Sequence, residues 1–195
     1  MGKKNIKTEC NGIEWGQFLA LTEKLKRNRE FKFLLLISLG GYSGLRVGDM
    51  LKLKWINIID KDELELYEGK TGKYRKITFN ESLKEIISLC FQNAQCEVNF
   101  EEHDFLFFNR KKGPLTRQYI NRQLHLIFKT NKVRVQNGSS HTLRKTFGRR
   151  VYEMNDKSEA SLVLLSSIFN HSSTSITRKY IGLTQETIQD VYINL

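Results

Sequence analysis

The alternation of apolar and polar residues that is typical of β-strands is confined to one early region of this sequence, with helical patterns on both sides. Three short strands are expected there, at 56–59, 64–67 and 74–79, joined by polar turns at 60–63 and 69–73. A doubly wound parallel sheet needs strands that alternate with helices, so it does not fit this order. The sequence therefore predicts a mainly α fold with a small antiparallel β-sheet (α+β).

Helical periodicity covers most of the remaining chain. The segment 15–29 is amphipathic, whereas 31–40 is apolar enough to be buried, and glycines at 40, 41 and 44 are expected to end it. Residues that favour helix N-caps precede several later segments. The later helices are expected at 45–52, 81–92 after Asn80, 117–129 after Thr116, 141–153 after Ser140, 159–169 after Ser158, from Ser172 or Ser173 on, and after Leu183, with a brief extended piece at 105–108.

The composition points to one domain that binds a polyanion. The chain has 195 residues, of which 39% are hydrophobic, and this is enough for one sizeable core. Lys and Arg number 32 against 21 Asp and Glu, so the formal net charge is +11. This surplus indicates nucleic acid as the first class of partner and an anionic membrane surface as the second. The longest apolar run, 33–37, is far below the ~18 residues of a membrane span.

Two features of the sequence indicate a cytoplasmic protein. The three cysteines are an odd number, and they do not form the framework of a disulfide-rich domain. The first dozen residues lack the apolar region of a signal peptide. A reducing compartment is therefore expected.

Positive charge is concentrated between residues 109 and 152, a stretch without Asp or Glu. A solvated helix face usually mixes both signs, because opposite charges four residues apart stabilise each other. A tract of one sign repels itself until a partner neutralises it, which DNA phosphates would do. A merely basic surface is the simpler alternative. The basic residues are Arg110, Lys111, Lys112, Arg117, Arg122, Lys129, Lys132, Arg134, Arg144, Lys145, Arg149 and Arg150.

Several common catalytic patterns are absent. Residues 69–71 (Gly-Lys-Thr) imitate the end of a phosphate-binding P-loop, but Leu64 stands where its first glycine should be. The cysteines and histidine within 90–103 lack the spacing of zinc ligands. The acidic residues of 60–63 are typical of a hairpin turn, and no Gly-x-Ser-x-Gly elbow occurs.

Three segments far apart in the sequence carry side chains suited to a phosphodiester. Segment 44–51 opens a helix after a glycine break and places an arginine and an aspartate three residues apart, where they can pair. Segment 141–144 (HTLR) sets an imidazole and a guanidinium at a helix start, where both can reach one phosphate. Segment 169–173 (FNHSS) lies at a helix break, and Tyr180 follows nine residues after its histidine. Taken alone, each segment is explained more simply by surface pairing or packing.

Taken together, and in chain order, these segments resemble the catalytic domain of the tyrosine recombinase (phage integrase) family, from about residue 15 to the C-terminus. Two departures stand out, because Asp49 is shorter than the family's usual Glu and Asn170 replaces a glycine. The family's motifs are matched by 44–49 for its Gly-Leu-Arg-x-x-Glu element, Lys70 within 69–73 for its hairpin lysine, 141–144 for its His-x-x-Arg box, 168–171 for its Leu-Gly-His box, and Tyr180 for its nucleophile.

The resemblance implies distinct roles for these residues in the cleavage of a DNA strand. Arginine is always charged and binds two phosphate oxygens, so the two arginines and a histidine would stabilise the transition state with no metal or other cofactor. The tyrosine would attack, another histidine would accept or orient its proton, and a lysine would protonate the leaving 5′-oxygen. Asp49 would hold Arg46 or His141 in place. The implied catalytic residues are Arg46, Lys70 (or else Lys73), His141, Arg144, His171 and the nucleophile Tyr180.

The resemblance also implies double-stranded DNA as the partner and self-association into a tetramer on two DNA sites. The segment 185–195 would dock into a neighbouring protomer or pack within its own chain. Its apolar residues are Ile188, Val191, Tyr192, Ile193 and Leu195. The residues expected to bind DNA are Lys73, Arg110, Lys111, Lys112, Arg117, Arg122 and Lys145.

The expected organisation is an N-terminal tail or linker remnant over 1–13 and a catalytic domain over 14–195. Family members usually carry an N-terminal core-binding domain as well, so the chain is expected to be a fragment. Two alternative functions stay open: a topoisomerase-like relaxing enzyme with the same covalent chemistry, and a catalytically dead DNA-binding module. Integration, excision, inversion and dimer resolution share this chemistry and are equally compatible.

Overall fold

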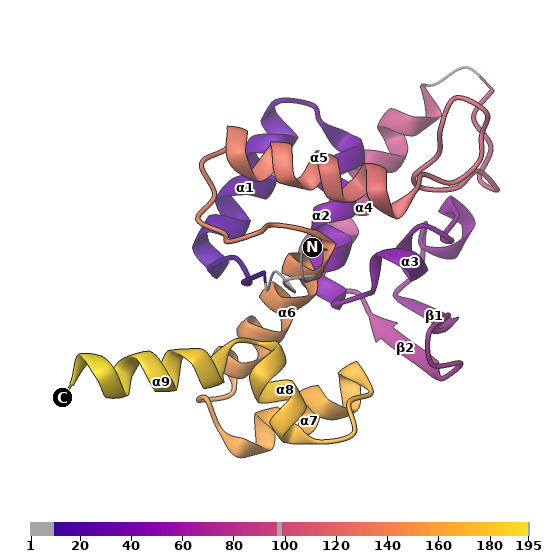
Figure 1. Cartoon of the computed structure of the whole chain (residues 1–195). Coiled ribbons are helices and arrows are strands. Elements are labelled where there is room, and N and C mark those ends of the chain that lie inside the picture. Colours follow the sequence, from indigo (N-terminus) through magenta and orange to yellow (C-terminus); the bar gives the residue numbers. More distant parts are fainter. Residues whose placement is uncertain (1–9, 97–98, 195) are drawn as a thin grey trace, which may run out of the picture.

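The computed structural model describes residues 10–96 and 99–194 of the chain (Figure 1). The predicted fold class is confirmed, because the described residues form mainly helices and one two-stranded antiparallel sheet. None of the helices described is long and apolar enough to cross a membrane. The helices are α1 (Trp15–Arg27), α2 (Phe31–Ser43), α3 (Val47–Met50), α4 (Glu81–Gln95), α5 (Arg117–Thr130), α6 (Ser140–Met154), α7 (Glu159–Phe169), α8 (Thr174–Tyr180) and α9 (Leu183–Ile193).

The sheet pairs β1 (Glu63–Tyr67) with β2 (Tyr74–Thr78), so two of the three predicted strands are confirmed. The strand predicted at 56–59 is wrong, since the short 3₁₀ helix η1 (Trp55–Asn57) occupies this region. The side chain of Asn57 accepts a hydrogen bond from the Lys54 amide at 2.8 Å and closes a local turn. Such side-chain bonds compete with strand pairing. The piece predicted at 105–108 forms only single bridges, to Lys54 and Pro114.

The prediction that α2 ends at Gly40 is wrong, because the helix continues through Gly40 and Gly41 to Ser43. Both glycines lie where neighbouring helices approach closely. A Cβ atom on Gly40 would lie 2.8 Å from the side chain of Leu143, and one on Gly41 would lie 2.3 Å from the ring of Phe18. The helix ends instead at Gly44, whose φ of +61° suits glycine. These glycines therefore serve packing, and only Gly44 ends the helix.

Most of the predicted helix starts are confirmed by their caps. The side chains of Asn80, Thr116 and Ser158 each accept a hydrogen bond from a backbone amide in the first turn of the following helix. The cap of α6 is Ser139 rather than the predicted Ser140. There the Ser139 amide donates to the Thr142 hydroxyl at 3.1 Å, and this contact fixes the helix start one residue earlier.

Two hydrophobic cores share helix α6. The main core collects buried side chains from α1 to α5, the sheet, the 105–108 segment and Leu143 at the start of α6. The C-terminal core is smaller and comprises Leu162, Leu165, Phe169 and Ile181, with Phe147 and Val151 of α6 packed against it. Figure 1 shows α6 leading from the first region to α7 and α8, with α9 extending away from the body.

Candidate active site

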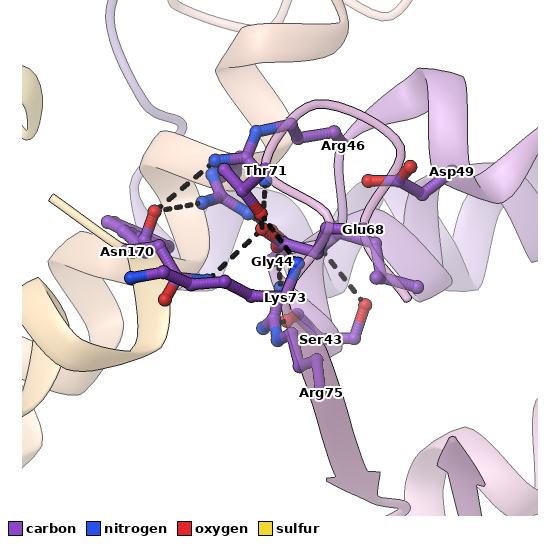
Figure 2. Close-up of polar contacts among 12 residues, drawn as sticks. Ser43, Gly44, Arg46, Asp49, Glu68, Thr71, Lys73, Arg75 and Asn170 are labelled. Carbon is purple, nitrogen blue, oxygen red and sulfur yellow. Dashed lines mark hydrogen bonds and ion pairs between the residues drawn. The ribbon is translucent and has the colours of Figure 1, made fainter. Parts of the chain in front are cut away.

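Two arginines from distant segments converge on one backbone oxygen. Arg46 directly precedes α3, and Arg144 is a buried residue of α6 that is only 3% exposed. Their Nη2 atoms donate to the carbonyl oxygen of Phe169 at 3.3 Å and 3.2 Å. Arg144 also donates to the carbonyl of Gly44, at the turn that ends α2 (Figure 2). The fold thus brings together the two guanidinium groups that the motifs had singled out.

Arg144 is held between the two cores. Its guanidinium lies 4.2 Å from the centre of the Phe169 ring, in a cation–π contact. Burial lowers the pKa of Arg144 to about 10, so the group is still protonated at neutral pH. A buried cation whose partners are carbonyl oxygens retains its positive charge. It is therefore well placed to bind an anionic ligand.

The turn between α7 and α8 places His171 beside Tyr180. Asn170 ends α7 in the left-handed conformation, with φ of 54°, which asparagine tolerates better than most residues. This explains how Asn170 stands where the family has glycine. The Nδ1 atom of His171 lies 2.9 Å from the Thr177 hydroxyl, and its ring meets the Tyr180 ring edge-on with centroids 5.3 Å apart.

The hydroxyl of Tyr180 is buried and meets no hydrogen-bond partner of normal geometry among the described residues. Burial raises the pKa of Tyr180 to about 12, and the charge of Arg144 opposes this rise. The Tyr180 ring packs edge-on against Phe169, and the ammonium of Lys145 lies 5.4 Å from its centre. The phenol is thus surrounded by cations, which would stabilise it once it loses its proton.

The two histidines and the hairpin lysine share one electrostatic environment. The pKa of His141 is lowered mainly by burial of the imidazole among protein atoms, even though part of the residue is exposed to solvent. The charges of four nearby cations lower it further, namely Lys145, Arg144, Arg117 and Lys70. Burial and three of the site's cations, Lys70 among them, lower the pKa of His171. Both imidazoles are therefore neutral at pH 7. Lys70 itself is exposed on the turn between β1 and β2, and its charge contributes to the lowered pKa of both histidines.

The predicted pairing of Asp49 with Arg46 or His141 is wrong as far as the described contacts go. Asp49 instead accepts a hydrogen bond from the Gly69 amide at 2.9 Å and so fixes the turn that carries Lys70. The carboxylate partner of Arg46 is Glu68, which the motif analysis missed. A signal was present in the sequence: alternation along β1 places residue 68 on the same face as the buried Leu64. A charge on the buried face of a strand requires a partner.

The residues predicted to bind DNA separate into three groups in the structure. Lys145 and Arg117 border the candidate site, because both lower the pKa of His141 and Lys145 also lies over the ring of Tyr180. Lys112 is engaged elsewhere, since it pairs with Asp104 and donates to the Asn99 carbonyl at 2.7 Å. The others are exposed on the surface, namely Lys73, Arg110, Lys111 and Arg122, which lies over the ring of Tyr119.

Comparison with known proteins gives concordant matches. The family model described as "Phage integrase family" matches residues 14–187. "Probable integrase/recombinase YoeC" of Bacillus subtilis is 34% identical over 171 residues, which are 86% of this chain and 86% of that protein. "Tyrosine recombinase XerH" of Campylobacter jejuni is 28% identical over 92% of this chain but only 47% of its own length. The chain thus spans most of the first relative and about half of the second.

Solved structures show the same fold. The crystal structure of XerA recombinase matches with a TM-score of 0.71 and 17% identity, over 94% of this chain and 64% of that one. XerH in a post-cleavage complex with a palindromic difH substrate matches with a TM-score of 0.69 and 19% identity, over 93% of this chain and 52% of that one. At this level of identity the structural likeness concerns the fold alone.

Proposed function

The chain belongs to the phage integrase family, the family of the tyrosine recombinases, and from this premise we propose that it is a site-specific recombinase that cleaves and rejoins DNA through Tyr180. The observation that carries the proposal is the convergence of Arg46 and Arg144 on one acceptor beside the buried phenol. Two guanidinium groups aimed at one oxygen provide a site for a phosphodiester.

In the proposed complex the scissile phosphate binds where the guanidinium groups of Arg46 and Arg144 now meet the Phe169 carbonyl. Each guanidinium has N–H donors beyond those that contact the protein. Negative charge grows on the non-bridging oxygens in the transition state, and a preorganised donor there is worth ~3 kcal/mol. A neutral His171 donates from Nε2 in the tautomer in which the Thr177 hydroxyl donates to Nδ1.

In the chemical step one DNA strand is cut, and its 3′-phosphate is transferred from the 5′-oxygen of the next nucleotide to the enzyme. The Tyr180 oxygen attacks phosphorus, a bond to the 3′-phosphate forms, and the bond to the 5′-oxygen breaks. The phenol gives its proton to His141, because burial and the surrounding cations lower the pKa of this imidazole and leave it neutral and able to accept the proton. Lys70 gives a proton to the leaving 5′-oxygen, with Lys73 as the alternative donor. The covalent bond conserves the energy of the phosphodiester, so no nucleotide is consumed.

We propose double-stranded DNA as the substrate and a tetramer on two DNA sites as the active assembly. The net charge of +11 supports the first, together with solved relatives whose titles name DNA substrates. The second is supported by α9, which extends away from the body and exposes Val191, Tyr192 and Ile193 (Figure 1). The side chain of Ile188 and the whole of Leu195 lie outside the described residues. The three free cysteines support action in the cytoplasm.

Covalent trapping tests the proposed chemistry. Sequencing of genomic DNA trapped on the protein would identify its target, from which a nicked suicide substrate can be built. The wild-type protein should form a denaturation-resistant adduct on this substrate. Tyr180→Phe should form none, whereas Tyr67→Phe, which removes a hydroxyl from an exposed side chain of β1, should behave as wild type.

Three other outcomes would redirect the proposal. An adduct with Tyr180→Phe would show that the nucleophile is another residue. Relaxation of supercoiled plasmid without site dependence would favour the topoisomerase-like alternative. DNA binding by the wild-type protein without any adduct would favour the catalytically dead module.

A further inference from the structure

Glu68 is a buried carboxylate that joins four segments of the candidate site. Its side chain has no exposed surface, and it forms an ion pair with Arg46. It also accepts from the Thr71 hydroxyl at 2.9 Å, from the Asn170 amide at 3.1 Å and from Arg75 Nη1 at 3.5 Å (Figure 2). These partners come from the start of α3, the hairpin turn, the turn after α7 and strand β2. The motifs that carry the resemblance, of which the nearest covers 69–73, do not include this position.

The carboxylate is ionised in spite of its burial. Burial on its own would raise the pKa of Glu68, but the hydrogen bonds from Arg46, Thr71 and Asn170 together lower it below its ordinary value. Without this charge, Arg46 and Arg75 would be two neighbouring cations with no carboxylate between them. A buried ion is costly to hold. Its presence here indicates a requirement for a fixed negative charge behind the phosphate site.

We infer that Glu68 is the positioning residue of this active site, which fixes the guanidinium of Arg46 and couples the lysine hairpin to the turn that carries His171. The inference rests on the proposed function. Glu68 contacts Nη1 of Arg46, and Nη2 of the same guanidinium then points to the Phe169 oxygen that Arg144 also contacts. Both contacts involve one planar group, so together they restrict the orientation of the guanidinium.

The second part of the inference concerns Asn170. Its amide connects the turn after α7 to Glu68, so the residue immediately before His171 is tied to the residue two positions before Lys70. Glycine at this position would suit the backbone equally well but could not form the bond. The asparagine therefore adds a polar link between the hairpin and the nucleophile-bearing region, and the link passes through Glu68.

Glu68→Gln tests this role, because it keeps the shape and removes the charge. With the suicide substrate, the single-turnover rate of adduct formation should fall about 10- to 100-fold, as expected when a catalytic group is misplaced by a fraction of an ångström. DNA affinity should change by less than about threefold, since Arg46 remains in the site as a cation even when its guanidinium is misplaced. Glu65→Gln is the matched control, because it removes the same charge from the exposed face of the same hairpin, where Glu65 pairs with Lys76.

Modified substrates separate a positioning role from a merely structural one. A methylphosphonate at the scissile position removes the charge that Arg46 would neutralise, so the difference between Glu68→Gln and wild type should shrink to about threefold or less. A 5′-bridging phosphorothiolate, whose leaving group needs no proton, should leave the difference unchanged. If instead the difference shrinks on the phosphorothiolate and persists on the methylphosphonate, Glu68 acts through Lys70, and the assignment to Arg46 is overturned. Equal rates for Glu68→Gln and wild type would also overturn it.

Asn170→Gly keeps the inference testable if Glu68→Gln does not fold. This variant preserves the left-handed turn and removes only the contact with Glu68, so the rate should fall by a factor of about 3 to 10. In the double variant the two losses should be less than multiplicative, because the contacts share one carboxylate. Independent, fully multiplicative losses would refute the coupling. Failure of the wild-type protein itself to form an adduct would count against the proposed function and not against this inference.

Discussion

The two cores of the molecule differ in size and in what they contribute to the candidate site. The main core draws on five helices and the sheet and positions Arg46, Lys70 and Glu68. The C-terminal core is small, and it positions His171 and Tyr180. Arg46 is thus held by the well-packed region, Arg144 lies between the two regions, and the nucleophile is held by the lightly packed one. Regions with few buried contacts open at lower free energy, so the nucleophile is on the part best able to move.

Polar contacts connect these two regions at the site. The Phe169 carbonyl accepts from Arg46 and Arg144, and Asn170 donates to Glu68. Unlike interdigitated apolar side chains, such contacts can be exchanged for contacts with a phosphate at little net cost. Because its hydrophobic core is divided, one chain can combine a well-packed cationic region with a lightly packed region that carries the tyrosine.

The largest expected effect comes from removing the arginines that span the two regions. Arg46→Ala and Arg144→Ala should each slow adduct formation about 100- to 1,000-fold in single-turnover assays, because each removes a preorganised donor. Arg27→Ala, which removes an exposed arginine of α1 outside the site and outside the basic tract, is the control. A loss of DNA affinity large enough to account for the whole effect would reduce both arginines to ordinary phosphate contacts.

Cavities in the two cores should have different consequences. Leu36→Ala in the main core and Leu165→Ala in the C-terminal core each remove a fully buried side chain and should cost about 2–5 kcal/mol locally. In hydrogen exchange, Leu165→Ala should reduce protection in α7 and α8 alone, whereas Leu36→Ala should reduce it throughout. Equal loss of protection across the chain in both variants would mean that the two regions unfold as one unit.

The close approach between α1 and α2 should be sensitive to a single methyl group. Gly41→Ala would place its Cβ atom against the Phe18 ring and should lower the free energy of unfolding by about 1–3 kcal/mol in urea titrations. Gly72→Ala, on the hairpin turn, meets open space but has φ of +65°, so it should cost about 1 kcal/mol. A larger loss at Gly72 than at Gly41 would contradict the packing role of the helix glycine.

Acid should weaken the C-terminal region by a small amount. Burial and neighbouring cations hold the pKa of His171 below its ordinary value of 6.5, so below this pH the unfolded chain binds more protons than the folded one. The titration of His171 should therefore add no pH dependence to the stability well above pH 6.5. As the pH falls below 6.5, it should lower the melting temperature. His171→Gln should flatten this dependence. A melting temperature that rises as the pH is lowered from 6.5 to 5 would contradict the predicted direction of the change.

The element order, most helix starts and the family of this protein could be predicted from local patterns and motif spacing. The helix cap at Thr116 and the alternation in β1 depend on residues only a few positions apart, so the local sequence is enough to predict them. Motif spacing was enough to select Arg46, Arg144 and Tyr180, which the fold then brought together. The strand expected at 56–59 failed for an equally local reason, because the Asn57 side chain formed a turn that the strand pattern did not reveal.

The ion pairs, in contrast, depend on the fold. Arg46 pairs with Glu68 rather than Asp49, and Lys112 pairs with Asp104. Whether a glycine ends α2 depended likewise on Phe18, which belongs to another helix. The physical reason is common to these cases. Burial and ion pairing depend on distances across the folded chain, and sequence separation does not encode those distances.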